Sequence, residues 1–430
     1  MSKKPAKKVK VQLAGAPKGM HDILPQDQPL WEKVRKATRE ISDFYNFHRI
    51  DTPIVEHIEL FERATGQETD IVQKQMFNIA SRGNDRLVLR PEGTPGVVRA
   101  YIQNGLSHMG QPLKLYYEGP MFRYEQPQAG RFRQFHQIGF EVMGGEDDSL
   151  YDIQVMQACY RLIEELKIKN TTLKINTLGC KNCRPVYKKK LQEYYKNKEK
   201  DLCVDCKRRL ATNPLRLLDC KEEKCVEMKK DAPVILDHLC ASCTKSFKGL
   251  LEYFEELDIP YLPDHYLVRG LDYYTGVVFE ITTEGFDFAL GGGGRYNDLV
   301  EQMGGRKTSA VGASLGVERL IEVMKAREIG EAIKPKPRVF LIHVGDIARK
   351  RSLGIIERLR QANIRVKESL GKDSLKAQFR NADRAGAPLA LIFGQKEAFE
   401  ENIIIRDMVT GAQETVPLAK MAEAIRRRLK

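Results

Sequence analysis

The stretch LKLYYEGPMFRYEQPQAGRFRQFHQIGFEVMG, residues 113–144, contains two apolar runs on either side of a polar segment. This pattern predicts two strands joined by a loop around QPQAG. Alternate residues of a strand point to opposite faces. Phe132, Ile138 and Phe140 fall on one face, which we expect to pack on a core. The opposite face favours the floor of a site over a plain exposed strand, because it carries Arg131, Arg133, Gln137 and Glu141.

Helical spacing of apolar residues marks the segment LWEKVRKATREISDFYNF, residues 30–47. It predicts a long amphipathic helix with an apolar stripe of Leu30, Trp31, Val34, Ala37, Ile41 and Phe44. HRIDTPIVE, residues 48–56, comes next as a short extended piece. DRLVLRPEGTPGVVRAYI, residues 85–102, predicts a strand, a turn and a helix that begins near Pro95.

Four consecutive glycines occur in ALGGGGRYNDLV, residues 289–300. They form neither a phosphate loop, because no Gly-Lys-Ser/Thr comes after them, nor a dinucleotide fingerprint. Phe288 and Leu290 lead straight into the run, which disfavours a linker. Glycine inside a strand pattern marks a place where a ligand comes close to the backbone. We therefore favour a pocket wall, with a structural bulge as the alternative.

Polar residues interrupt two further apolar segments. RGLDYYTGVVFE, residues 269–280, places Arg269, Asp272 and two adjacent tyrosines in an otherwise apolar strand, and such rings can line a small polar pocket. GASLGVERL, residues 312–320, has small residues before Arg319 at a predicted strand-to-helix junction. Small residues let a flat ligand approach, and an arginine can stack on a base or bind phosphate.

Eight of the nine cysteines form four pairs, three of them with Cys-x-x-Cys spacing: Cys180/Cys183, Cys203/Cys206, Cys220/Cys225 and Cys240/Cys243. The thiolates of one such pair can bind one metal ion, so four pairs could close two tetrahedral zinc sites. Both sites would be structural, because four thiolates leave no position for water. Reduced thiols or a degenerate site are the alternatives, and the spacing does not say which pairs share an ion.

Composition favours a globular protein with a polyanionic partner. Of the 430 residues, 42% are hydrophobic and 30% charged, and 71 Lys and Arg against 58 Asp and Glu give a net charge of +13. No apolar run approaches the roughly 20 residues that cross a bilayer. The basic start has no apolar stretch after it, so we expect no secretory signal, no membrane partner and a cytoplasmic location.

Taken together, these motifs resemble the histidyl-tRNA synthetase family, a class II aminoacyl-tRNA synthetase family. GPMFRYEQPQAGRFRQFHQIGFE resembles the second signature motif of the class, GASLGVERL the third, and RIDTPIVE with its preceding helix the first, which serves mainly a dimer interface. RGLDYYTGVVFE and GGGGRYNDL resemble stretches particular to the histidine enzymes, and LRPEGT completes the set.

The resemblance implies an α+β fold, with an antiparallel sheet flanked by helices as the class II catalytic core. A Cys-rich module would be inserted in this core, and a C-terminal α/β domain would bind the anticodon. The expected parts are a basic flexible tail (1–16), the first part of the catalytic domain (17–173), the Cys-rich module (174–250), the second part of the catalytic domain (251–330), a linker (331–337) and the anticodon-binding domain (338–430).

The resemblance also implies a homodimer that activates L-histidine with ATP and transfers it to tRNA(His). Arg269 and Arg123 would be catalytic, facing the α-phosphate, and Mg²⁺ would neutralise the outer phosphates. ATP would be bound by Arg123, Arg131 and Arg319. Histidine would be bound by Glu92, Gly93, Thr94, Arg123, Gln137, Glu141, Arg269, Tyr273 and Tyr274, with Glu141 and the two tyrosines at the imidazole.

Gln126 departs from the pattern of the family, which commonly has arginine at this position of the loop facing the tRNA acceptor end. Two other functions compete with the ligase. One is a histidine-sensing regulatory paralogue of histidine biosynthesis, which typically loses the ATP-binding arginines and the anticodon domain. The other is a tRNA-binding module without activity, which has no need of the RGLDYYTG pocket.

Overall fold

The computed structural model describes residues 15–66, 69, 71–128, 130–330, 338–371 and 374–429. The chain divides into two compact units, Met1–Glu331 and Ala332–Lys430. Residues 1–14 of the expected tail and the whole expected linker lie outside the described residues. Among the described residues, no helix combines the length and the apolar character needed to cross a bilayer.

An eight-stranded sheet organises the first unit, in the order β1-β5-β6-β11-β10-β9-β7-β8. Neighbouring strands from β5 to β7 are antiparallel, as expected, whereas β1 and β8 add parallel edges. The strands are β1 (His48–Arg49), β5 (Leu113–Phe122), β6 (Gln134–Met143), β7 (Thr171–Thr177), β8 (Tyr261–Pro263), β9 (Val277–Thr283), β10 (Gly291–Arg295) and β11 (Ala310–Gly316).

Helices cover one face of this sheet and bury its apolar residues. Ile138 and Phe140 of β6 are wholly buried in the core on that face, as expected. Phe132, expected on the same face, precedes β6 and is only partly buried, so its place in the core was wrong. The helices that pack there are α1 (Gln28–Phe44), α4 (Ser149–Glu165), α8 (Ala241–Glu256) and α10 (Val317–Ala326).

The predicted first helix is confirmed as α1, with one error at its end. Trp31, Val34 and Ala37 are buried, as the helical spacing requires. Phe44 is 76% exposed, so its place in the apolar stripe was wrong. The helix ends at Phe44 and the chain turns through Asn46, whose φ is +59°, so the last aromatic residue projects beyond the core.

The opposite face of the sheet carries a second apolar core and the inserted module. A small sheet, β2 (Val55–His57), β4 (Leu87–Leu89) and β3 (Phe77–Ile79), lies in the same unit. The helices that contribute to this second core are α2 (Ile58–Thr65), α3 (Thr94–Gln103), α5 (Cys183–Lys196), α6 (Val204–Thr212), α7 (Glu223–Lys229) and α9 (Leu299–Gln302).

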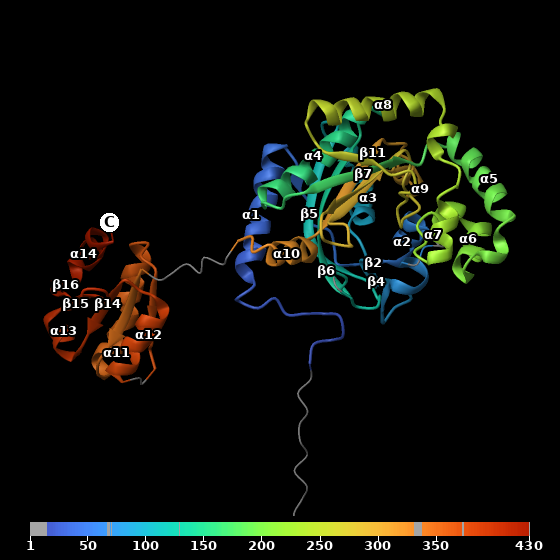
Figure 1. The fold of residues 1–430 in the computed structure, drawn as a ribbon. Helices are drawn as coiled ribbons and strands as arrows, with labels where there is room; N and C mark the ends of the chain where they lie inside the picture. The colour runs from blue at the N-terminus through green and yellow to red at the C-terminus, as the bar shows by residue number, and fades with distance from the viewer. Residues whose placement is uncertain are drawn as a thin grey trace, which may run out of the picture. The chain divides into compact units, whose positions relative to one another are not determined.

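The cysteine-rich segment leaves the sheet at the end of β7 and returns to it through α8. β7 pairs with β9 up to Thr177, so the first residues of the segment expected at 174–250 belong to the sheet. α8 lies along α4 and buries Phe247, Leu250 and Phe254 in the first core (Figure 1). The helices α5, α6 and α7 come between β7 and α8 in the chain. They lie on the side of α2 and α9 that faces away from the central sheet (Figure 1).

The second unit is a small α/β domain. Its five-stranded sheet has the order β13-β12-β14-β15-β16, parallel from β13 to β14 and antiparallel from there on. The elements are β12 (Val339–His343), α11 (Asp346–Gln361), β13 (Val366–Glu368), α12 (Leu375–Ala385), β14 (Leu389–Phe393), α13 (Gln395–Glu400), β15 (Asn402–Asp407), β16 (Gln413–Pro417) and α14 (Met421–Arg428).

A buried ion pair fixes the end of β10 to α4. The Arg295 side chain is 6% exposed and its guanidinium lies 2.6 Å from the carboxylate of Asp152, which is fully buried. Asp147 accepts a further bond at 2.5 Å, and Ser309 accepts another at 2.9 Å. Removal of one partner of such a pair leaves a buried charge without compensation.

We predict that Arg295→Met lowers the free energy of unfolding by about 3–5 kcal/mol, because Asp152 stays buried without its cation. Arg86→Met is the matched control, since Arg86 pairs with Glu59 and Glu62 but is 60% exposed. This control should cost only about 0–1 kcal/mol. Urea titration followed by circular dichroism measures both, and equal losses would contradict the assignment of Arg295 as an anchor.

Candidate active site

A cavity of about 870 Å³ lies over the polar face of β6. β6, β10 and β11 contribute to it, together with the loop before β9 and the start of α10. Four arginines line it: Arg123, Arg131, Arg269 and Arg319. Carboxylates line it as well, Glu92 and Glu280 among them. A concave site that offers several guanidiniums can bind a polyanionic ligand.

Arg319 is fixed at one part of the cavity by backbone carbonyls. Its Nε donates to Gly130 at 2.9 Å and its Nη1 to Ala289 at 2.7 Å, while the guanidinium lies over the ring of Phe288. Burial lowers the pKa of Arg319, and the positive charges of Arg131 and Arg123 lower it further. An anion between these guanidiniums would relieve their mutual repulsion.

Arg123 is fixed by a carbonyl and a ring in a similar way. Its Nε donates to the carbonyl of Pro91 at 2.9 Å, and its guanidinium lies 5.3 Å from the ring centroid of Phe135. Arg131 lies in the same cavity, 3.6 Å from the carboxylate of Glu125. Arg123 and Arg131 thus reach the cavity from the loop between β5 and β6, and Arg319 reaches it from α10.

Two buried polar atoms at the cavity have no hydrogen-bond partner among the described residues: Nε of Arg269 and Oε1 of Gln137. Arg269 uses another nitrogen, Nη1, to bind Glu280 at 2.5 Å. Buried polar groups are nearly always paired, and an orphaned one needs an explanation. Because both residues line the cavity, a polar ligand there would supply the partners.

Glu92 is a buried carboxylate at the cavity and accepts two hydrogen bonds. Thr65 donates to one oxygen at 3.2 Å and the hydroxyl of Tyr273 to the other at 2.8 Å. Burial raises the pKa of Glu92, and the positive charge of Arg123 opposes this shift. A bound ammonium group would favour the ionised form of this carboxylate.

Glu141 lies one layer behind the cavity and is fully buried. Thr94 donates to one of its oxygens at 2.6 Å and Tyr296 to the other at 2.5 Å. A Cβ at Gly312, opposite Glu141 in the β11–β6 register, would lie 1.5 Å from the carboxylate, so only glycine fits there. Burial raises the pKa of Glu141 to about 8, although both hydrogen bonds act in the opposite direction.

The other residues expected at the histidine site lie around Glu92 and Glu141. Tyr273 and Tyr274 are buried and line the cavity, with ring centroids 4.6 Å apart. Gly93 lies behind them, where a Cβ would lie 2.3 Å from the ring of Tyr117. The structure thus brings the predicted residues to one cavity, except that Gly93 and Glu141 support its wall from behind.

Two local expectations were wrong. Arg269 to Tyr274 form a loop rather than a strand, because pairing with β7 and β10 begins only at β9. Arg131 and Arg133 precede β6, since the chain turns at Gly130, whose φ is +66°. Arg133 stacks on Tyr124 instead of lining the cavity, whereas Arg131 does reach it.

The four glycines form the strand β10 itself, as a wall of the cavity. Gly291 and Gly292 line the cavity. A Cβ at Gly292 would lie 2.6 Å from Nη1 of Arg269, and one at Gly294 would lie 3.0 Å from the ring of Tyr274. The pocket-wall interpretation is therefore confirmed, since side chains of the site occupy the space that β10 leaves free.

Sequence reasoning missed four residues that support the site. Tyr296 and Tyr117 lie against the Glu92 and Glu141 region, and Glu280 binds Arg269. Glu318 accepts hydrogen bonds from the backbone and ring of His136 and so fixes the start of β6. A glutamate within the apolar run VVFEITT was a usable signal for Glu280. Tyr296 lies in the GGGGRYNDL stretch, but its bond to Glu141 spans 155 positions of the sequence, so spacing gave no signal for that contact.

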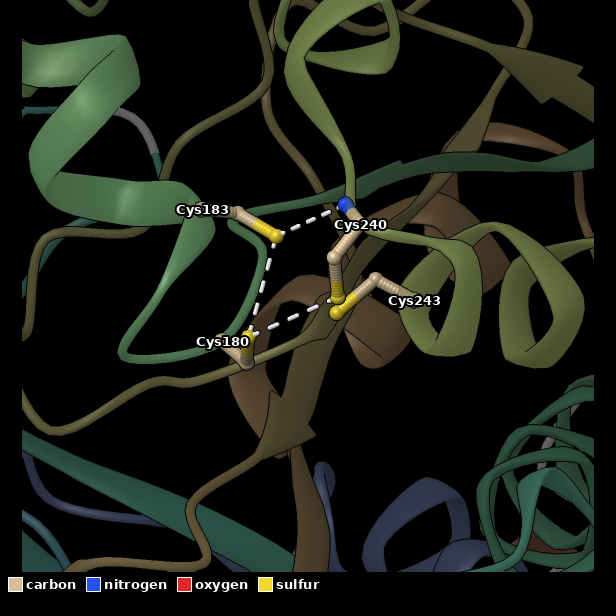
Figure 2. Close-up of side chains that lie close together, drawn as sticks. All are labelled: Cys180, Cys183, Cys240 and Cys243. Carbon is tan, nitrogen blue, oxygen red and sulfur yellow. Dashed lines mark hydrogen bonds between the residues drawn. The ribbon is translucent and has the colours of Figure 1, made fainter.

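The eight paired cysteines form two groups of four. Cys180, Cys183, Cys240 and Cys243 form one group, which we call the outer cluster (Figure 2). Cys203, Cys206, Cys220 and Cys225 form the other, the inner cluster. Within each cluster all four sulfur atoms lie within 4.8 Å of one another, and all are free thiols.

The mostly antiparallel sheet and its arginine-lined cavity, in a chain with a separate α/β unit, define a class II aminoacyl-tRNA synthetase. The family model that matches residues 19–320 is described as histidyl-tRNA synthetase, and the one that matches residues 338–428 as an anticodon binding domain. The chain belongs to the histidyl-tRNA synthetase family.

Similar proteins match over nearly the whole chain. The histidine–tRNA ligase of Thermodesulfovibrio yellowstonii is 44% identical over 414 residues, which cover 96% of this chain and 98% of the relative. That of Dehalococcoides mccartyi is 42% identical over 416 residues, 96% and 99% of the two chains. The crystal structure of apo S. aureus histidyl-tRNA synthetase has a TM-score of 0.80 at 32% identity and covers 96% and 100%.

We predict that Glu141→Gln stabilises the protein increasingly from about pH 5 to pH 8. The carboxyl group of Glu141 has a folded-state pKa of about 8 against an ordinary value of 4.5. Its contribution to stability is therefore present below the lower value and is lost as the pH rises through the higher one. The amide stays neutral and can replace the protonated acid.

Melting temperatures of the two proteins at pH 5.5, 7 and 8.5 test this. The difference, Glu141→Gln minus wild type, should increase across this series. A constant difference would show that Glu141 is ionised in the folded protein throughout this range.

Proposed function

We propose that this protein is a histidine–tRNA ligase that works in two steps at the cavity over β6. In the first step the carboxylate of histidine attacks the α-phosphorus of ATP, and pyrophosphate leaves. In the second step a hydroxyl group of the terminal adenosine of tRNA(His) attacks the carbonyl carbon of histidyl-adenylate, and AMP leaves. The single observation that carries this proposal is the pair of orphaned polar atoms on Arg269 and Gln137, in a cavity with four arginines.

The arginines match the charge that develops in the first step. Attack on the α-phosphate spreads negative charge over its oxygens, and fixed guanidiniums in a site of low dielectric stabilise that charge. Arg123 and Arg269 would bind the α-phosphate. Arg319 would bind the far end of ATP, and Arg131 would assist it. Their carbonyl and carboxylate partners hold the guanidiniums in place before the substrate arrives.

The carboxylates and tyrosines match a histidine substrate. The α-ammonium group would bind Glu92, Thr94 and Gln137, whose free Oε1 is an acceptor. The imidazole would lie at Tyr273 and Tyr274 and reach toward Glu141. Each oxygen of Glu141 accepts one hydrogen bond, from Thr94 or from Tyr296, and keeps a second lone pair that can accept a ring N–H. An amino acid without a ring N–H would lack this buried hydrogen bond.

Two kinds of metal ion belong to the proposal. Histidyl-tRNA synthetases generally use ATP together with a divalent metal ion. Mg²⁺ bound to the β- and γ-phosphates would neutralise the negative charge that the arginines leave. Zn²⁺ would be held by the cysteine clusters. This zinc would be structural, because a tetrathiolate site has no open position.

A homodimer in the cytoplasm is also part of the proposal. Apolar side chains near the segment that resembles the first class II motif support it: Phe44, Ile54 and Val55 are 76%, 42% and 41% exposed. Such a group of exposed apolar side chains favours an interface. Sedimentation equilibrium of the full chain measures the mass directly.

The regulatory alternative fits less well. A histidine sensor does not need to bind ATP, yet Arg123, Arg269 and Arg319 all line one cavity. The second unit matches the anticodon-binding family model over residues 338–428. A tRNA-binding module without activity, in turn, leaves the buried amino-acid pocket without a purpose.

Pyrophosphate exchange with each of the twenty amino acids tests the proposal. Wild type should exchange with histidine only. Arg269→Ala should lose at least about a hundredfold, because one preorganised cation is removed from the transition state. Arg161→Ala is the control, since Arg161 pairs with Glu164 at the surface of α4 and should exchange normally. Folded wild type without exchange, with Mg²⁺ present, would overturn the ligase proposal.

A further inference from the structure

We infer that each cysteine cluster binds one Zn²⁺ and that the two zinc sites together brace the loop of residues 269–276, here the histidine loop, against the cavity. This inference rests on the proposed function, because the histidine loop carries Arg269, Tyr273 and Tyr274. It assigns the partners of each cysteine pair, and it gives the inserted module a positioning role in histidine binding.

The sulfur geometry fits one tetrahedral ion in each cluster. A Zn–S bond of about 2.3 Å places the sulfur atoms of a tetrahedron about 3.8 Å apart. Sγ of Cys180 lies 3.7 Å from that of Cys183 and 3.9 Å from that of Cys240 (Figure 2). In the inner cluster, Sγ of Cys203 lies 3.8 Å from that of Cys220. A disulfide requires about 2.05 Å, so these cysteines are not joined to one another, and their separations match those of ligands around one ion.

Backbone N–H groups already point at the sulfur atoms. Cys240 N donates to Cys183 Sγ at 3.0 Å, and Asn182 N donates to Cys180 Sγ at 3.4 Å. In the inner cluster, N–H groups of Cys203 and Cys206 donate to sulfur at 3.4 Å. Such hydrogen bonds stabilise thiolates and orient them toward a metal. The pairing is nested: the first pair shares an ion with the fourth, and the second pair with the third.

The outer cluster is joined directly to the histidine loop. Gly179, next to Cys180, accepts a hydrogen bond from Gly276 N at 3.0 Å, and Leu178 N donates to Gly276 O at 2.6 Å. Arg184, next to Cys183, donates to the carbonyl of Tyr274. The zinc of this cluster would therefore fix the two segments that hold the end of the loop.

The inner cluster is joined to the start of the same loop. Between Cys206 and Cys220 the chain carries Asn213, which donates to the carboxylate of Asp272 at 3.0 Å. It also carries Arg216, which donates to the carbonyl of Arg269 at 3.1 Å. Asp219 and Lys221, the neighbours of Cys220, line the cavity. The module is thus part of the cavity wall.

Zinc supplies order that the module lacks otherwise. α6 and α7 are short helices, 9 and 7 residues long, and isolated helices of this length are marginal in water. Metal binding to such a small segment contributes directly to its folding. Without zinc, the carbonyl of Arg269 and the carboxylate of Asp272 would lose fixed partners. We therefore expect the histidine loop to open locally while the central sheet stays folded.

The test begins with elemental analysis of the full-length protein, purified with zinc present, for which we expect two zinc ions per chain. Each of Cys240→Ser and Cys225→Ser should contain one. Ser242→Ala, an exposed neighbour of Cys243 without a thiol, is the control and should contain two. Fewer than two zinc ions per chain in folded wild type would overturn the assignment of one ion to each cluster.

Hydrogen exchange then tests the brace. On removal of zinc from wild type with a strong chelator, amides of residues 269–276 should exchange about tenfold faster or more, while those of β5 and β6 stay unchanged. Added Zn²⁺ should restore protection. Unchanged exchange in the histidine loop would overturn the brace. Because zinc is removed here from wild type, this experiment tests the brace even if a cysteine variant does not fold.

Kinetics separate this inference from the proposed function. In pyrophosphate exchange, loss of zinc should raise KM for histidine more than KM for ATP, because the loop holds the amino-acid site. Equal effects on both would indicate a general loss of structure and contradict the positioning role. A zinc-loaded protein without any histidine exchange would overturn the ligase proposal and leave the zinc assignment standing.

Discussion

Arg269 and Tyr274 lie directly against the backbone of β10, and this close approach is the constraint on which the rest of the site depends. Nη1 of Arg269 lies 2.6 Å from where a Cβ of Gly292 would be. On the other side, Ala313 approaches the position of a Gly293 Cβ to 2.6 Å. Because the glycines of β10 have no side chains, the histidine loop and the neighbouring strand β11 can both pack directly against its backbone, which forms a wall of the cavity.

Buried polar side chains in this protein fall into two kinds: those that pair with each other and fix the fold, and those that keep an atom available for a ligand. Arg295 and Asp152 satisfy each other in the interior and fix the end of β10. Arg269 and Gln137 instead each keep a buried polar atom without a partner, and both residues line the cavity. The same low dielectric that makes these orphaned atoms costly would strengthen their bonds to a charged substrate. The arginines of the cavity are thus held by neutral carbonyls and by glutamates at their margins.

Elements with a local cause could be predicted from the periodicity of the sequence. The alternation of β6, the helix α1 and the strand-to-helix junction before Arg319 are of this kind. Prediction failed where the tertiary environment decides. An apolar stretch around Tyr273 became a loop because contacts from the inserted module, such as Arg216 to Arg269, hold it there. Tyr296 and the pairing of the cysteines depend on contacts between distant segments, which spacing alone does not encode.

Calorimetric titration of histidine into Gly292→Ala tests the central role of β10 most directly. The added methyl group meets Arg269 and the carbonyl of Phe279, at 2.6 and 2.5 Å, so the guanidinium or the strand must shift. Gly249→Ala on α8 is the control, because its nearest neighbour would lie at an ordinary 3.4 Å. We expect the affinity for histidine to fall at least about tenfold in folded Gly292→Ala and to stay unchanged in the control. Unchanged affinity in folded Gly292→Ala would contradict the account.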